Sequence, residues 1–202
     1  MDFPWDESRR AFDDAATWFA GMAASVGDRW TERGLGEWTV RDLVGHTSRS
    51  LLTVEAYLAR PAASVEIASA AAYFRATREA AAGPDVAQRG RDAGAALGAD
   101  PAPAVAEIVA RVLPLVATKD GGELLTTIVG GMRLADYLPT RTFELAVHTA
   151  DLAVALDVAP DVPPTAAAQA LRVVADLAVG DGVAGPLLLL ATGRPVGGFS
   201  VL

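Results

Sequence analysis

The chain has 202 residues, of which 51% are hydrophobic, so one domain with or without a small extension can bury a sizeable core. Twenty-five acidic side chains against seventeen basic ones give a net charge of −8, which argues against nucleic acid and anionic membranes as partners. The sequence has no cysteine, which excludes disulfides and a cysteine nucleophile, and it shows neither a bilayer-length apolar run nor a basic leader, which predicts a cytoplasmic protein.

Helical spacing dominates the N-terminal part of the chain. Apolar residues recur on one face of a helix expected over residues 7–26. The start of the next helix is marked by a capping box and a hydrophobic staple, formed by Thr39 with Asp42 and by Trp38 with Leu43. We therefore expect two long amphipathic helices before the first proline-rich break.

The middle of the chain gives weaker signals. A third helical stretch is expected over residues 64–82, before Pro84, and a weaker, glycine-containing one over residues 85–99. A further helix is expected over residues 102–118. Residues 123–129 lie between two glycine pairs and are β-prone, so a short extended piece is expected there.

The strongest late signal is a helix over residues 134–156, in which Pro139 marks either a kink or the true start. Another helix is expected over residues 165–179, followed by a short apolar stretch. Strand signals are sparse, so the expected fold is all-α. It comprises a four-helix bundle in residues 1–158 and a short C-terminal extension packed on the bundle in residues 159–202.

Two histidines, His46 and His148, are the only ones in the chain, and both lie on expected helices. Glu144 precedes His148 by four residues, so the two side chains share one helix face, with their Cβ atoms about 5–6 Å apart. At that spacing a carboxylate oxygen and an imidazole nitrogen can reach one metal ion, and His46 can supply a third ligand. Two histidines and one carboxylate leave coordination positions open for water or substrate, as in catalytic sites.

Two neighbouring charged residues are candidates for catalysis. Asp151 follows His148 by three residues and can orient its ring, while Arg141 can hold the Glu144 carboxylate or bind an anionic substrate. These residues also have ordinary structural explanations, because Glu-x-x-x-His pairs are common on helices, Arg141 can form a plain i,i+3 ion pair with Glu144, and Asp151 can simply be solvated. The spacing alone leaves both interpretations open.

Two segments resemble a known family. Residues 38–46 (Trp-Thr-Val-Arg-Asp-Leu-Val-Gly-His) and 141–152 (Arg-Thr-Phe-Glu-Leu-Ala-Val-His-Thr-Ala-Asp-Leu) are similar to two signature motifs of the mycothiol-dependent maleylpyruvate isomerase family. That family belongs to the DinB/YfiT-like group of metal-binding four-helix bundles. Residues 191–202 are similar to its C-terminal end. The resemblance covers most of the chain and implies a DinB/YfiT-like bundle with additional short C-terminal helical elements.

The resemblance also implies the site and its cofactors. In the family the matching positions, here His46, Glu144 and His148, bind one divalent metal, usually zinc, and mycothiol is the thiol cosubstrate. Mycothiol is an actinobacterial thiol, and the single lysine and absent asparagine of this chain also suggest a genome rich in G and C. The chain departs from the isomerase because it lacks room for the larger α/β C-terminal domain. No position of this chain aligns with an arginine of the isomerase's substrate pocket, and Arg75 and Arg78 are only the nearest in character.

The expected function is that of a zinc-dependent and mycothiol-dependent thiol transferase or isomerase, in which a metal-bound thiolate attacks a small electrophile such as maleylpyruvate. Asp151 and Arg141 are the expected catalytic residues, with Tyr73 and Tyr137 as candidate acids. The alternatives are a metal-dependent hydrolase with Asp151 as base, and a non-catalytic bundle that binds a metal or small ligand. The expected partners are a small electrophile and a low-molecular-weight thiol, with no nucleic acid or membrane, for a monomer or homodimer.

Overall fold

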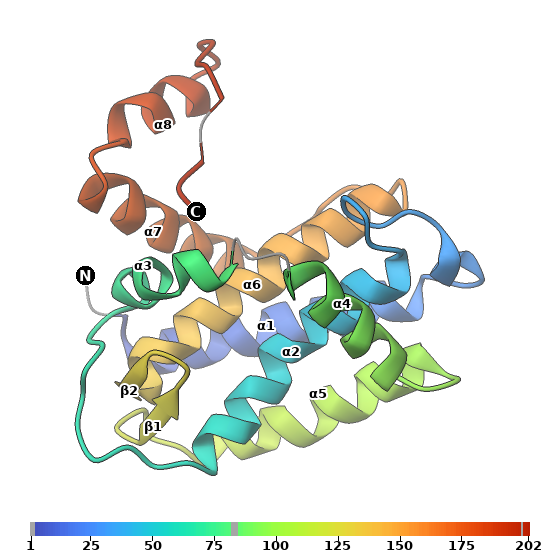
Figure 1. The fold of residues 1–202 in the computed structure, drawn as a ribbon, viewed down its shortest axis with the longest axis horizontal. Coiled ribbons are helices and arrows are strands. Elements are labelled where there is room, and N and C mark those ends of the chain that lie inside the picture. Colours follow the sequence, from blue (N-terminus) through green and yellow to red (C-terminus); the bar gives the residue numbers. More distant parts are fainter. Residues whose placement is uncertain (1–2, 82–84, 199) are drawn as a thin grey trace.

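The structure is a computed structural model that describes residues 3–81, 85–198 and 200–202. In this part of the chain the fold is all-α apart from one small hairpin, as the sequence predicts (Figure 1). Its elements, in chain order, are α1 (Trp5–Ala24), the 3₁₀ turn η1 (Arg29–Thr31), α2 (Val40–Leu58), α3 (Ala70–Ala81), α4 (Asp85–Ala96), α5 (Pro101–Ala117), β1 (Leu124–Thr127), β2 (Gly130–Arg133), α6 (Leu134–Ala155), α7 (Pro164–Gly180) and α8 (Ala184–Ala191).

Four helices form the central bundle. Helices α1 and α2 each pack against both α5 and α6, so the four enclose one apolar core. The apolar stripes of α1 and α2 supply much of this core, because their i, i+3 and i+4 positions point inward. Its largest fully buried side chains include Phe12, Phe19, Leu43, Leu51, Leu138 and Leu145.

The start of α2 has the predicted capping box. The Thr39 hydroxyl accepts a hydrogen bond from the Asp42 amide at 3.2 Å, and the Asp42 carboxylate accepts one from the Thr39 amide at 3.0 Å. The Trp38 indole, just before the cap, donates to the Ala87 carbonyl of α4 at 3.0 Å. These bonds fix the direction in which α2 enters the bundle.

Helix α4, expected to be a weak helix, packs along α2 at very short range. A Cβ atom on Gly45 would lie 2.2 Å from the Gly94 backbone nitrogen, and one on Gly90 would lie 2.4 Å from the Trp38 indole. The glycines that weaken the helix in isolation therefore permit its backbone to approach α2.

The third helix starts later than predicted. Residues 64–69 are not helical, because the backbone amides of Glu66 and Ile67 donate to the Gly131 carbonyl of the hairpin at 2.8 and 3.0 Å. The expected end of this helix at residues 82–84 lies outside the described residues. Pro139 is not the start of α6, which begins at Leu134 and continues through the proline.

The expected extended piece is the first strand of an antiparallel hairpin, in which Leu124 pairs with Arg133 and Thr127 with Gly130. At the C-terminal end, α7 packs on α1 and α6 and buries Val173 and Leu177 in the common core, whereas α8 projects from the body (Figure 1). No helix in the described part of the chain has the length and apolar character needed to cross a bilayer.

Candidate metal centre

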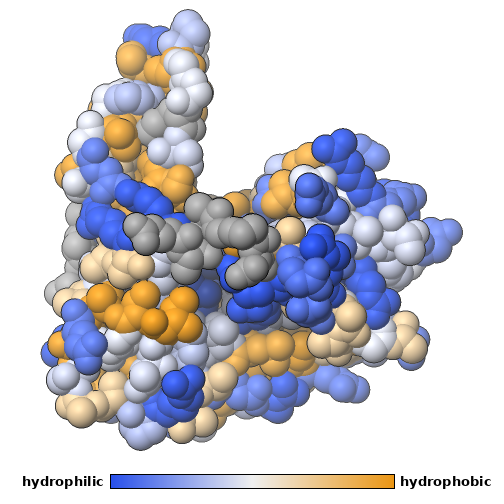
Figure 2. All heavy atoms as spheres, viewed as in Figure 1, coloured by the Kyte–Doolittle hydropathy of each residue, from blue (hydrophilic) through white to orange (hydrophobic). Residues whose placement is uncertain are grey.

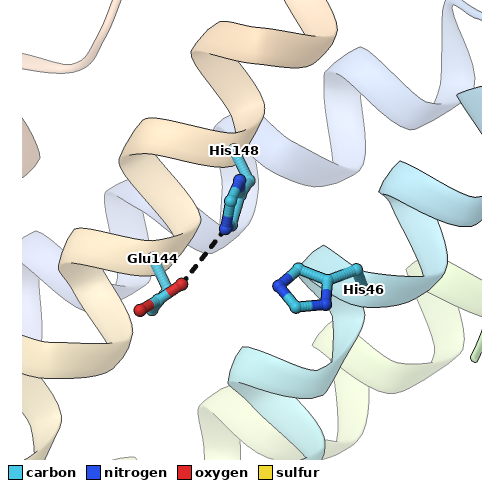
Figure 3. Close-up of side chains that lie close together, drawn as sticks. All are labelled: His46, Glu144 and His148. Carbon is cyan, nitrogen blue, oxygen red and sulfur yellow. Dashed lines mark ion pairs between the residues drawn. The ribbon is translucent and has the colours of Figure 1, made fainter. Parts of the chain in front are cut away.

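The bundle brings the two histidines and Glu144 together. His46 comes from α2, and Glu144 and His148 from the facing side of α6 (Figure 3). One ligand atom from each of the three residues lies within 4.8 Å of the other two. His46 and His148 are 102 residues apart in the sequence, and the packing of α2 against α6 brings them together.

His148 lies between two carboxylates. Its Nε2 atom is 3.2 Å from a Glu144 oxygen, and its Nδ1 atom is 3.1 Å from an Asp151 oxygen. Burial alone would lower the pKa of His148, but the hydrogen bonds to Asp151 and Glu144 outweigh it and raise the pKa to about 9. In the metal-free protein the ring is therefore an imidazolium at neutral pH.

The Glu144 carboxylate is kept ionised. Burial favours its neutral form, but the hydrogen bond with His148 and the positive charge of Arg141 together lower its pKa to about 2. Glu144 is consequently an anion throughout the physiological range, which is the form in which a carboxylate binds metal.

The environment of His46 is different. Its ring lies 4.5 Å from the Trp38 ring and 4.9 Å from the His148 ring, between centroids. Burial, reinforced by the positive charge of His148, lowers the pKa of His46 to about 4. The buried Nδ1 atom has no hydrogen-bond partner in the described chain. His46 is thus a neutral imidazole with an unused nitrogen, and a neutral imidazole is the ligand form.

The three side chains fit a divalent metal such as zinc. With bonds of about 2.0–2.2 Å, two ligand atoms of a tetrahedral ion lie about 3.4 Å apart. The 3.2 Å between His148 and Glu144 meets this spacing, and ligand atoms within 4.8 Å of one another need only small side-chain movements. His148 would bind a metal through Nε2 as a neutral imidazole, with its Nδ1–H group donating a hydrogen bond to Asp151.

Arg141 does not form the i,i+3 ion pair that its spacing suggests. In the described chain its guanidinium makes no ion pair with Glu144 but lies over the rings of Tyr137 and Tyr73, at 5.0 and 5.3 Å from their centroids. Its Nε atom donates to Thr140 Oγ1 at 2.9 Å. The remaining N–H groups of this half-buried cation have no partner among the described residues.

The two tyrosines differ as candidate acids. Tyr137 is fully buried and donates its hydroxyl to Thr53 at 3.0 Å, and burial raises its pKa. Tyr73 is buried too, at 5% exposure, and burial raises its pKa as well. Arg75 and Arg78, the residues nearest in character to a substrate-pocket arginine, form ion pairs with Asp181 of the C-terminal segment.

Trp38 belongs to the site although the sequence assigned it only to the helix start. It lies before the N-cap of α2, where no helical spacing relates it to His46. The interaction depends on how the chain enters α2, and on Gly90 of α4 leaving room for the indole. In the sequence, the only indication that Trp38 and His46 belong together was that both lie in the first signature motif.

A family model described as the mycothiol maleylpyruvate isomerase N-terminal domain matches residues 9–153. The chain belongs to this family. The match covers α1 to most of α6 and therefore includes both helices that carry the His46, Glu144 and His148 cluster. No curated protein and no solved structure matches the chain.

In this member of the isomerase family, α7 and α8 lie beyond the matched residues. The DinB-like bundle is thus the part shared with the family, and the C-terminal helices are additional. The residues that the sequence singled out, His46, Glu144, His148 and Asp151, form one connected cluster in the shared part.

Proposed function

We propose that the protein is a metal-dependent enzyme that uses mycothiol to transfer a thiol to, or isomerise, a small electrophile such as maleylpyruvate. The observation that carries this proposal is the cluster of two imidazoles and one carboxylate on α2 and α6, in a chain that has no thiol of its own. Membership of the mycothiol maleylpyruvate isomerase family supports mycothiol as the external thiol. In the isomerisation the thiolate sulfur adds to one carbon of the carbon–carbon double bond, the π bond breaks, and its electron pair moves onto the rest of the substrate. Rotation about the resulting single bond and cleavage of the carbon–sulfur bond then return the thiol and the isomer. In transfer to a halide, the carbon–sulfur bond forms as the carbon–halogen bond breaks, and the halide leaves together with the thiol proton.

His46, Glu144 and His148 would hold the metal, for which zinc is the best candidate on donor type. When bound, it supplies a positive charge that favours the thiolate form of a thiol. Asp151 accepts a hydrogen bond from the Nδ1–H group of His148, which leaves Nε2 as the ligand atom. Trp38 covers one face of His46 and limits the rotation of that ring.

Arg141 would bind an anionic group of the electrophile. Its guanidinium lies over two tyrosine rings and has N–H groups that bond to none of the described residues, one helical turn from Glu144. A carboxylate can accept two of these hydrogen bonds in parallel, which fixes its orientation. The carboxylates of maleylpyruvate suit this cation.

The hydrolase alternative needs a base near the metal that is not a ligand. Asp151, the only such candidate in the sequence, is engaged with the Nδ1 atom of His148. This contact favours a role for Asp151 in orienting the ligand and weakens the case for a hydrolase.

Metal content gives the first test. We expect one equivalent of divalent metal per chain after purification in zinc and exhaustive dialysis, and less than a tenth of that in His46→Ala and His148→Ala, by elemental analysis. Glu107→Gln, a change of an exposed carboxylate on α5, is the control and keeps its metal. Equal metal in wild type and in both histidine variants would overturn the assignment of the site.

Turnover with and without thiol gives the second test. Wild-type protein of known metal content is assayed with maleylpyruvate and with a halodinitrobenzene, each with mycothiol, with another thiol and with none. We expect a rate above the uncatalysed one only with mycothiol, and at least a hundredfold lower rate in His148→Ala. Turnover that needs no thiol would support the hydrolase, and metal binding without any turnover would leave a binding protein.

A further inference from the structure

Helix α8 is apolar on all its sides and buries none of its residues. Its sequence contains four consecutive leucines, Leu187–Leu190, of which Leu188 is 66% exposed and Leu190 is 54% exposed. Isolated helices shorter than about 12–15 residues are marginal in water, and α8 has eight residues. A helix that is apolar all round is normally a buried one. A single copy of the chain therefore leaves α8 without the packing that such a helix requires.

The helix belongs to a larger apolar projection, the C-terminal arm, which we define as residues 182–198. Figure 2 shows the arm standing away from the rest of the molecule, with apolar residues on it and a recess between it and the body. At its base, Val179 of α7 is 71% exposed. Leu189, between Leu188 and Leu190 on α8, is 43% exposed. A specific interface between two copies needs about 1,000 Å² of buried surface in total, or about 500 Å² from each copy.

The base of the arm is held in one orientation. Asp181, which immediately precedes it, accepts a hydrogen bond from Arg75 Nε at 2.7 Å and pairs also with Arg78, both on α3. Arg78 lies within hydrogen-bonding distance of the Val201 carbonyl after the arm, at 3.4 Å. The arm is thus tied to the body at both ends, which lowers the entropy lost when its surface binds a partner.

The charge pattern indicates what kind of partner fits. Arg194 is the one charged residue among positions 182–198. In an interface with two-fold symmetry each surface meets a copy of itself, so any cluster of like charge would oppose association. The uncharged leucine surface of α8 is compatible with this arrangement. It lacks the lysines and arginines that border the apolar face of a membrane-surface helix.

We propose that the C-terminal arm is a two-fold homodimer interface in which α8 of one chain packs against α8 of a second copy. The inference rests on the exposed leucines, the fixed base and the absence of like charges, and it is independent of the proposed metal chemistry. The first test is the mass in solution, measured by light scattering over a range of protein concentrations. We expect twice the chain mass of 20.9 kDa for the wild type.

Two substitutions examine the surface directly. Leu188→Glu with Leu190→Glu should raise the dissociation constant about thirtyfold or more, the loss expected when a central contact of an interface is removed. Both side chains are largely exposed in the single chain, so the fold, measured by circular dichroism, should not change. Ile128→Glu, at the hairpin turn and 65% exposed, is the matched control and should stay dimeric.

The absence of cysteine permits a second test. A short bismaleimide linker should join two copies of Leu188→Cys rapidly and two copies of Ile128→Cys no faster than chance collisions allow. A monomeric wild type at all concentrations would overturn the proposal. So would a dimer whose Leu188→Cys variant is linked no faster than the control, because its interface would lie elsewhere. Flotation of monomers with phosphatidylcholine vesicles would assign the arm to a membrane instead.

Discussion

His148 Nε2 can hold either a proton or a metal ion, and the structure shows how closely the two are balanced. In the metal-free form the ring is an imidazolium between Glu144 and Asp151. The carboxylates that stabilise this cation are the same groups that a metal site needs, one as a ligand and one as the partner of the ligand. A buried charge cluster of this kind has an electrostatic energy that depends strongly on pH.

We predict the pH dependence of the metal-free protein from His148. Its pKa is about 9 in the folded state against an ordinary 6.5, so its contribution to stability is complete below pH 6.5 and is lost as pH rises through 9. The melting temperature, measured in the presence of a chelator, should therefore decrease as the pH is raised from 6.5 to 9. The fall should be much smaller in His148→Gln, and an equal fall in both proteins would contradict the assignment.

Below pH 6.5 the stability of the metal-free protein depends on pH in the opposite direction, because of His46. Its folded pKa of about 4 lies below the ordinary 6.5, so the unfolded state binds the proton more readily and stability decreases as pH falls from 6.5 to 4. Glu144, with a folded pKa of about 2, adds a further loss below pH 4.5. The metal-free protein should be most stable near pH 6.5, which a pH series of thermal melts will show.

Asp151 gives a second prediction at the scale of single residues. Asp151→Asn removes the charge that holds the Nδ1 proton of His148, so metal affinity should fall by about 10- to 100-fold. Asp161→Asn, a change of an exposed carboxylate before α7, should leave the affinity unchanged. The affinities are measured by competition with a chromogenic chelator, and equal values for the two variants would remove Asp151 from the site.

At the scale of secondary structure, the helices that the sequence predicted best are those whose stability is local. The start of α2 is determined by Thr39 and Asp42, three residues apart, and both bonds of the predicted box are present. The start of α3 could not be predicted, because residues 64–69 look helical but bond to Gly131 of the distant hairpin. The helix expected over residues 85–99 is present as α4, and the glycines that gave it a weak helical signal are the sites of its close packing on Trp38 and α2.

The same distinction applies to the site. The relation of Glu144 to His148 follows from helical spacing and is present at 3.2 Å. The approach of His46 needed the motif resemblance, since no local rule relates α2 to α6. The position of Arg141 on two tyrosine rings depends on tertiary packing, and spacing suggested a different partner.

The contact between α2 and α4 gives a prediction for the elements. Gly45→Ala should destabilise the protein by about 1–3 kcal/mol or more, because its Cβ would lie 2.2 Å from backbone of α4 that cannot rotate away. Gly21→Ala on α1 is the control, since nothing lies within 4 Å of its Cβ. Alanine lowers the conformational entropy of the unfolded backbone relative to glycine, so that variant should be stabilised by up to about 1 kcal/mol. Urea unfolding of both measures the difference.

At the scale of the whole molecule, the two C-terminal helices have different relations to the bundle. Helix α7 contributes Val173 and Leu177 to the common core, and Gln169 on it donates a hydrogen bond to Ser8 of α1 at 2.8 Å. Helix α8 contributes no buried residue. The division of the chain at residue 158 stays a prediction, and these contacts suggest that α7 is needed for the stability of the bundle.

Two truncations separate these roles. Each core side chain lost with α7 costs about 2–5 kcal/mol, against a total stability of about 5–15 kcal/mol, so the chain ending at residue 158 should not unfold cooperatively. The chain ending at residue 182 keeps α7 and Asp181, and at concentrations where the full chain is monomeric its melting temperature should lie within about 4 °C of the full chain's. Calorimetry of both fragments decides the matter. A stable fragment 1–158 would make α7 an accessory element, whereas a large loss on removing α8 alone would show that the arm stabilises the monomer and not the pair.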